Sequence, residues 1–236
     1  MNDIPAGQIY DRPLREANTR GSRHNTGTVF SEKMDGPIDW VGPHERMFLI
    51  RAELDPRITR ILYQPVRYDI LTGEDGSASA FPDFLIEIDG VEEVHEVKPD
   101  DQYARPDVRR RLIATAHAAA RHGHRYAVTL SSDLHRKDDK AAIEAIWRRL
   151  GDPVAPELLL AVDDLLSDGP LPIGEACAML SRHDATIADF HGMLASGHVA
   201  ADMTTPPDET MIVHGRTSGV RFTRLIPFTS PIGDQR

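Results

Sequence analysis

The hydrophobic positions along the chain change their spacing several times, and each spacing predicts a kind of element. Residues 44–56 carry apolar side chains at helical spacing up to a proline, which predicts a helix. Residues 58–71 are rich in β-branched and aromatic side chains and predict one or two strands with a bend at their proline. Residues 81–99 hold two extended runs joined by Asp89-Gly90, a dipeptide typical of two-residue hairpin turns.

The pattern continues with an amphipathic helix over 106–122, a short strand over 125–130 and a second helix over 138–150. Helix, strands, hairpin, helix, strand and helix in this order predict an α/β sandwich with helices packed on a sheet. After a proline-containing boundary, residues 156–214 predict three short helices and a small hairpin, an order that resembles a winged helix-turn-helix.

We therefore expect four regions. Residues 1–42 lack a sustained period and predict an irregular N-terminal arm, and residues 43–150 form the α/β domain. Residues 151–214 form a winged-helix-like domain, and residues 215–236 form a C-terminal tail. Basic and apolar residues alternate in the tail, which either pairs as a strand with a partner or lies against DNA.

Charge is distributed unevenly along a chain whose formal net charge is −10. Between Arg105 and Arg125 the charged residues are arginines except for Asp107, whereas residues 151–202 contain many acids and Arg182 as their only Lys or Arg. Two regions of opposite charge suggest two kinds of partner. The single cysteine, Cys177, excludes an intrachain disulfide. The sequence has no apolar run of about 18 residues and no signal-peptide core, so we expect a cytoplasmic protein without a membrane partner.

The hairpin predicts a cluster of charged side chains. If Asp89-Gly90 is the turn, the antiparallel ladder places Asp83 opposite Glu96, and directly opposite residues project from the same face. Lys98 lies two residues beyond Glu96 and shares that face, while Val97 points away from it. A shift of one residue in the register would separate the two carboxylates.

Two adjacent carboxylates repel each other unless a cation lies between them. Mg²⁺ or Mn²⁺ would suit such oxygen ligands, and a bound metal would activate water for phosphodiester hydrolysis. Lys98 would then orient the water or neutralise charge in the transition state. The alternative is a solvated strand surface, on which cross-strand Glu–Lys pairs are common.

Pro82-Asp83 followed by Glu96-Val97-Lys98 is the PD-(D/E)xK signature of restriction-endonuclease-like nucleases, whose core has the order αβββαβ. The combination of E-L-DP, QP, PDF, EVKP and a helix ending in HG resembles the TnsA-like family over residues 20–150. TnsA-like proteins are the endonuclease subunits of heteromeric bacterial transposases. The resemblance implies a Mg²⁺-dependent endonuclease that cleaves the 5′ ends of a mobile element, while a DDE-type transposase cleaves the 3′ ends.

The resemblance also implies roles for individual residues. Glu45, Asp83 and Glu96 supply the acidic metal site, the backbone carbonyl of Val97 is a further ligand, and Lys98 is the catalytic lysine. Glu45 is assigned by the resemblance alone, since an exposed helical glutamate is the alternative. Some family members have glutamine where this chain has Glu96.

Four arginines of the basic helix are expected to contact the phosphates of double-stranded DNA, unless they form only a solvated helix face: Arg105, Arg109, Arg110 and Arg111. Gln64, in the QP motif, is expected to have a structural role at the end of a strand. The predicted third helix of the C-terminal region has no lysine or arginine to bind DNA, so we expect that region to bind another transposition subunit, such as an AAA+ regulator.

The leading hypothesis is a TnsA-like, Mg²⁺-dependent DNA endonuclease of a heteromeric transposase. One alternative is a stand-alone restriction or repair nuclease with the same site. The other is a catalytically silent scaffold that binds DNA and partner proteins.

Overall fold

The chain divides into two compact units of mixed α/β structure. The computed structural model describes residues 4–15, 25–71, 76–216 and 222–232. Unit 1 comprises Met1–Ala52, Arg57–His135 and Ile226–Arg236, and unit 2 comprises Glu53–Pro56 and Arg136–Leu225. The predicted α/β class is confirmed. Across the described ranges, every helix is too short or too polar to cross a membrane.

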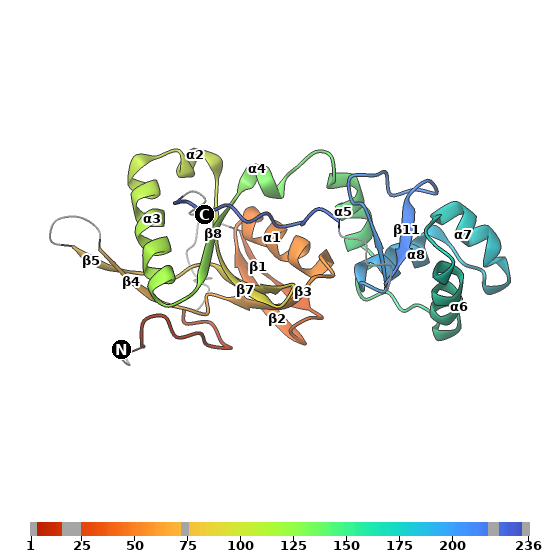
Figure 1. Cartoon of the computed structure of the whole chain (residues 1–236), viewed down its shortest axis with the longest axis horizontal. Helices are drawn as coiled ribbons and strands as arrows, with labels where there is room; N and C mark the ends of the chain where they lie inside the picture. Colours follow the sequence, from red (N-terminus) through yellow and green to blue (C-terminus); the bar gives the residue numbers. More distant parts are fainter. Residues whose placement is uncertain (1–3, 16–24, 72–75, 217–221, 233–236) are drawn as a thin grey trace. The chain divides into compact units, whose positions relative to one another are not determined.

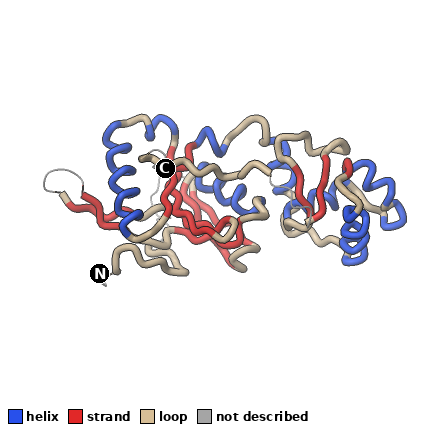
Figure 2. The backbone as a smooth tube through the Cα atoms, in the orientation of Figure 1, coloured by secondary structure: helices blue, strands red, loops and turns tan. Residues whose placement is uncertain are grey.

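The main sheet of unit 1, whose strands are drawn as arrows in Figure 1 and in red in Figure 2, has the order β3-β6-β7-β8. Its members are β3 (Ile58–Tyr63), β6 (Phe84–Ile88), β7 (Val91–Lys98) and β8 (Arg125–Leu130). The first three strands are antiparallel, and β8 is parallel to β7. Parallel neighbours require a crossover, and α3 (Pro106–Arg121) supplies it, with the short α2 (Asp100–Tyr103) preceding α3 and α4 (Ser131–Leu134) following β8.

The hairpin between β6 and β7 has the predicted turn and register. Asp89 and Gly90 both have positive φ, 52° and 76°, as a type I′ turn requires. Pairing runs from Ile88↔Val91 to Phe84↔His95, which confirms the register predicted from the turn.

Helices cover both faces of this sheet. On one face, α1 (Pro43–Leu54) packs through Phe48, whose ring stacks on that of Phe84 with centroids 4.5 Å apart. On the other face, Leu112 and Ala116 of α3 belong to one buried apolar cluster with Val94. The alternation of side chains along β7 therefore directs successive residues to α1 and to α3.

Unit 1 contains two further hairpins, one of which corrects a prediction. Strands β1 (Thr26–Ser31) and β2 (Gly36–Val41) pair antiparallel inside the predicted irregular arm, so that prediction is wrong for this part. The buried cross-strand pair Val29↔Ile38 stabilises this hairpin. The alternation of apolar and polar residues in the two strands is short and interrupted by polar residues, so the sequence pattern did not indicate strands. Strands β4 (Tyr68–Leu71) and β5 (Ser77–Ala80) form the other hairpin, which packs on α3.

Unit 2 contains the predicted three helices and small hairpin. Its elements are α5 (Lys140–Trp147), α6 (Pro156–Ser167), β9 (Leu171–Pro172), α7 (Ile173–Met179), η1 (Ser181–His183), α8 (Ile187–Ala195), β10 (Val199–Ala201) and β11 (Ile212–Gly215). The strands form a sheet of order β10-β11-β9. The unit boundary differs from the expected division at residue 150, because the apolar face of α5, with Ile143 and Ile146, is buried and α5 packs on α8.

The C-terminal tail packs against its own chain. From Ile226 the chain belongs to unit 1, and Ile226 is fully buried. Val128 of β8 donates a backbone hydrogen bond of 2.9 Å to the carbonyl of Thr229, and the guanidinium of Arg125 lies 4.6 Å from the ring centroid of Phe228. The free edge of β8 is therefore the partner of this part of the tail, where the sequence left a partner chain or DNA as alternatives.

Candidate functional site

Asp83 lies directly before β6, and its carboxylate is buried. The side chain is held across the hairpin, because Oδ2 accepts a hydrogen bond of 2.8 Å from the backbone N–H of Val97. Burial raises the pKa of Asp83 well above its usual value, and the charge of Glu96 raises it further. A carboxyl group held in this way is costly to ionise without a nearby cation.

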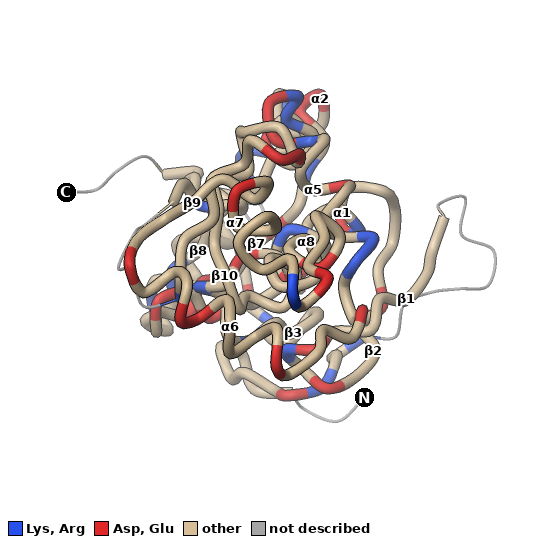
Figure 3. Tube along the Cα trace, turned by 90° about the vertical axis from the view of Figure 1, so that its right-hand side faces the viewer, with Lys and Arg blue, Asp and Glu red and all other residues tan. Residues whose placement is uncertain are grey.

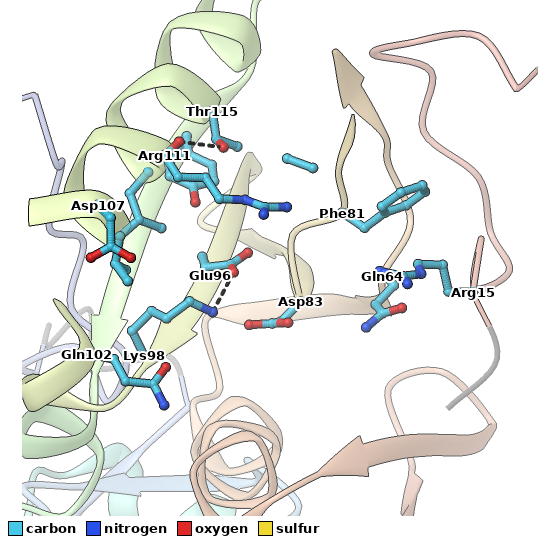
Figure 4. A pocket seen from close by; sticks show the side chains of 14 residues that line it. Arg15, Gln64, Phe81, Asp83, Glu96, Lys98, Gln102, Asp107, Arg111 and Thr115 are labelled. Carbon is cyan, nitrogen blue, oxygen red and sulfur yellow. Dashed lines mark hydrogen bonds and ion pairs between the residues drawn. The ribbon is translucent and has the colours of Figure 1, made fainter. Parts of the chain in front are cut away.

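Glu96 and Lys98 project from β7 toward α3 and form an ion pair (Figure 4). Nζ of Lys98 lies 2.5 Å from Oε1 of Glu96, and it donates a second hydrogen bond of 3.1 Å to the carbonyl oxygen of Val97. Burial alone would lower the pKa of Lys98, but the charges of Glu96 and Asp83 outweigh burial and the pKa is raised. Lys98 is therefore a protonated ammonium group at the centre of the site.

Glu45 lies in the first turn of α1. Its Oε2 accepts a hydrogen bond of 2.8 Å from the backbone N–H of Val41, the last residue of β2, so the carboxylate binds the backbone just before its own helix. Burial raises the pKa of Glu45 to about 7, and Lys98 and Glu96 are near enough to affect it. Glu45 is thus close to the cluster but is engaged elsewhere.

Asp83, Glu96 and Lys98 line one pocket of about 440 Å³ in unit 1. The hairpin register predicts this convergence. The pocket is closed by α3 and by the segments before β4 and β6, and its apolar lining includes Phe81 and Leu112. Its size lies within the range of about 300–1,000 Å³ that is usual for ligand pockets.

The oxygen atoms of the cluster suit a hard divalent cation, but in the structure they contact the ammonium group of Lys98. Mg²⁺ prefers carboxylate and carbonyl oxygens, and the carboxyl groups outnumber the single ammonium group. In the described part of the chain, no group of three or more His, Cys, Asp or Glu side chains is placed to hold a metal ion. Lys98 pairs with the carboxylate of Glu96 and donates a hydrogen bond to the carbonyl oxygen of Val97, while Glu45 accepts a hydrogen bond from Val41. A metal would have to displace Lys98 from these oxygens.

Only one of the four predicted DNA-binding arginines reaches the pocket. Arg111 lines it, and its Nη2 donates a 3.2 Å hydrogen bond to the carbonyl of Ser79. Arg105 instead pairs with Asp107 at 2.9 Å, and the guanidinium of Arg109 lies 5.4 Å from the ring centroid of Tyr103. Arg110 is exposed on α3 and does not line the pocket.

Sequence reasoning did not identify several of the lining residues as site residues, among them Tyr126, Gln64 and Arg15. Tyr126 of β8 is buried, and its Oη has no hydrogen-bond partner among the described residues. Gln64 has a left-handed backbone, with φ of 42°, directly before a proline. Arg15 comes from the N-terminal arm. The β-branched and aromatic pattern of β8 indicates a strand, but no local signal shows that it neighbours β7.

Comparison with known proteins adds no family assignment. No protein-family model matches the chain, and no curated protein matches it either.

Proposed function

We propose that the protein is a metal-dependent DNA endonuclease that hydrolyses phosphodiester bonds. The observation that carries this proposal is the convergence of Asp83, Glu96 and Lys98 in one pocket, with Arg111 at its side. Two carboxylates that are held together at the cost of a raised pKa are typical of functional sites rather than of solvated strands.

Each side chain has a chemical role in this proposal. Asp83 and Glu96 would hold Mg²⁺ or Mn²⁺, and the Val97 carbonyl and, after rotation, Glu45 would be further donors. When bound, the metal supplies an activated water and stabilises the leaving oxygen. Lys98, released from Glu96, donates hydrogen bonds to the water or to the charge that develops on the phosphate. Hydrolysis leaves a 5′-phosphate and a 3′-hydroxyl.

Arg111 contributes to substrate binding in the same proposal. Its guanidinium reaches the pocket from α3 and can form paired hydrogen bonds with a phosphate group (Figure 4). It is the member of the basic helix that we propose contacts the cleaved strand.

We propose further that the chain is the TnsA-like subunit of a heteromeric transposase in the cytoplasm, acting at transposon ends beside a DDE-type transposase. The order α1-β3-β6-β7-α3-β8 supports a restriction-endonuclease-like core, and it agrees with the αβββαβ order that the motif implies. The sequence motifs supply the rest of the support. A stand-alone restriction or repair nuclease would have the same site and no such partners.

The order α6-β9-α7-α8-β10-β11 supports a winged-helix-like unit 2. We propose that this unit docks a protein such as an AAA+ regulator. Its α8 carries no lysine or arginine, and acidic residues lie on α6 and α7 (Figure 3). A surface of this charge repels DNA phosphates.

The test is a cleavage assay with the cognate transposase and element ends, with and without Mg²⁺. Asp83→Ala and Lys98→Ala should each abolish 5′-end cleavage while the melting temperature shows that the fold persists. The exposed Asp69→Ala is the matched control. Cleavage retained by the Asp83 or the Lys98 variant would refute the assignment.

A catalytically silent scaffold is the second candidate, and the position of Lys98 favours it. An ammonium that holds Glu96 and the Val97 carbonyl can stabilise a folded site that never binds a metal. Calorimetric titration with Mg²⁺ and with Mn²⁺ in the presence of duplex DNA separates the two. Metal uptake supports the nuclease, and no uptake supports the scaffold.

A further inference from the structure

The N-terminal arm is attached to the strand region that precedes β4. Backbone N–H groups of Gly7, Tyr10 and Leu14 donate to the carbonyls of Arg67, Pro65 and Gln64 at 2.8, 2.9 and 3.1 Å. An isolated antiparallel bridge joins Ile9 and Val66. Residues 4–15 therefore follow an edge of unit 1 in a fixed path, and this path ends at the pocket.

Arg15 stands where this path meets the pocket. Its guanidinium lies 5.0 Å from the ring centroid of Phe81, and both side chains line the pocket with Asp83 (Figure 4). Within the described ranges no acidic side chain forms an ion pair with Arg15, in contrast to Arg105, which Asp107 neutralises. A guanidinium that stacks on an aromatic ring keeps its in-plane donors available for an anion.

Gln64 connects the arm to the carboxylate site. Its carbonyl accepts the Leu14 hydrogen bond, and its own N–H donates to the carbonyl of Asp83 at 2.8 Å. The positive φ of Gln64 before a proline is a strained conformation that the surrounding contacts must hold in place. Arg15 and Asp83 are thereby fixed relative to each other through one residue.

We infer that Arg15 binds a phosphate group of the DNA strand next to the scissile phosphate, on the side of Asp83 away from Arg111. This inference rests on the proposed endonuclease function. In Figure 4, Arg15, Gln64 and Phe81 lie on one side of Asp83, and Arg111 and Lys98 lie on the other. A strand whose cleaved phosphate lies at the carboxylates then meets one arginine on each flank, and bidentate arginine–phosphate contacts fix its position.

A substitution at Gly7 should displace the arm without changing a residue of the pocket. Its φ is 76°, and a Cβ added there would lie 2.1 Å from Nδ1 of His122, just after α3. Gly7→Ala therefore requires the His122 ring to move and strains the backbone of the arm. It changes no residue that lines the pocket.

The experiment is fluorescence anisotropy of a labelled DNA duplex bound by the full chain without Mg²⁺, over a series of salt concentrations. Arg15→Gln should weaken binding about tenfold and lower the slope of log affinity against log salt by about one, as expected for one lost phosphate contact. Arg12→Gln removes the same charge from the same arm outside the pocket and should stay within about twofold of the unchanged protein. Gly7→Ala should reproduce part of the Arg15→Gln loss, and the double variant should be no weaker than Arg15→Gln alone.

The outcomes separate the inference from the proposed function. If Arg15→Gln binds like Arg12→Gln while Asp83→Ala abolishes cleavage, the inference is overturned and the endonuclease proposal stands. If Arg15→Gln has the expected effect while Asp83→Ala still cleaves, the DNA subsite stands and the catalytic assignment fails. An unchanged protein that does not bind the duplex even at low salt overturns both. Additive losses in the double variant would also overturn the inference, since the arm would then act independently of Arg15.

Discussion

The backbone N–H of Val97 donates a hydrogen bond of 2.8 Å to the carboxylate of Asp83, which ties the entrance of β6 to the far end of β7. The contact gives Asp83 one strong donor in a site where burial and the charge of Glu96 both disfavour its ionised form. The backbone therefore fixes the position of the carboxylate, while the charge of Lys98 opposes the rise in its pKa.

Asp83→Asn should stabilise the metal-free protein or leave it unchanged. The amide oxygen can still accept from Val97, while the repulsion from Glu96 disappears, which favours folding by about 1–2 kcal/mol. Urea unfolding of both proteins in a chelator measures this difference. Asp69→Asn, at an exposed ion pair with Arg67, is the control. A loss of stability in the Asp83 variant would show that its negative charge stabilises the fold.

Lys98→Met should bind Mg²⁺ more tightly than the unchanged protein and should not cleave DNA. The ammonium group of Lys98 contacts a carboxylate oxygen of Glu96 and the carbonyl oxygen of Val97, which the metal would also bind. Without the ammonium group, the metal no longer competes with it for these oxygens. We expect an affinity increase of about tenfold, the equivalent of roughly 1.4 kcal/mol. Calorimetric titration checks it, and weaker binding by the variant would mean that Lys98 supports the metal instead of opposing it.

Glu45 should make the stability of the metal-free protein depend on pH. Because burial raises its pKa from 4.5 to about 7, the folded protein retains a proton that the unfolded chain has released. The protonated Glu45 therefore contributes to the free energy of unfolding. This contribution is complete below the pKa of the unfolded chain, 4.5, and is lost as the pH rises through about 7. Urea unfolding across this range should show a smaller decline for Glu45→Gln. Equal declines in the two proteins would contradict the shift.

Tyr126→Phe should stabilise the metal-free protein by about 1 kcal/mol or more, because a buried hydroxyl without a partner costs about 1–3 kcal/mol. Tyr126 lines the pocket with both carboxylates, and its hydroxyl forms no hydrogen bond with the described residues. Thermal and urea unfolding measure the effect, and Tyr68→Phe is the contrasting variant. Tyr68 bonds His124 at 2.6 Å, so its loss should destabilise. A destabilised Tyr126 variant would show that the hydroxyl has a partner.

Arg111→Gln should weaken DNA binding by the full chain about tenfold, whereas Arg182→Gln should change it less than twofold. The first arginine lines the pocket in unit 1, and the second is exposed on the acidic unit 2. Both substitutions remove one positive charge, so a difference in affinity between the two variants shows which unit contacts the DNA. Equal losses would indicate that unit 2 also contacts the duplex.

The features that were predicted from the sequence are those that local interactions determine. The dipeptide Asp89-Gly90 specifies its turn, and the turn specifies every pairing of β6 with β7. The convergence of Asp83, Glu96 and Lys98 follows from that register alone. The amphipathic helices and the bend at Pro65 likewise follow from short-range patterns.

The features that were not predicted depend on contacts between distant segments. The place of Tyr126 depends on the parallel pairing of β8 with β7, which no turn encodes. The path of Arg15 depends on bonds between the arm and residues 64–67. Assigning α5 to unit 2 required knowing which neighbour covers Ile143, and its amphipathic pattern is compatible with either domain.

Unit 1 is assembled from separate stretches of the chain, since residues 226–232 complete the free edge of β8. A deletion that stops at Leu150 would strip Val128 of its acceptor, Thr229, and would leave α5 without α8. Joining His135 to Ile226 through a short linker would keep all of unit 1 and would leave only Glu53–Pro56 of unit 2. A protein fused after the tail would be attached to unit 1. A bulky fusion there would therefore affect the unit that contains the pocket and not the acidic unit.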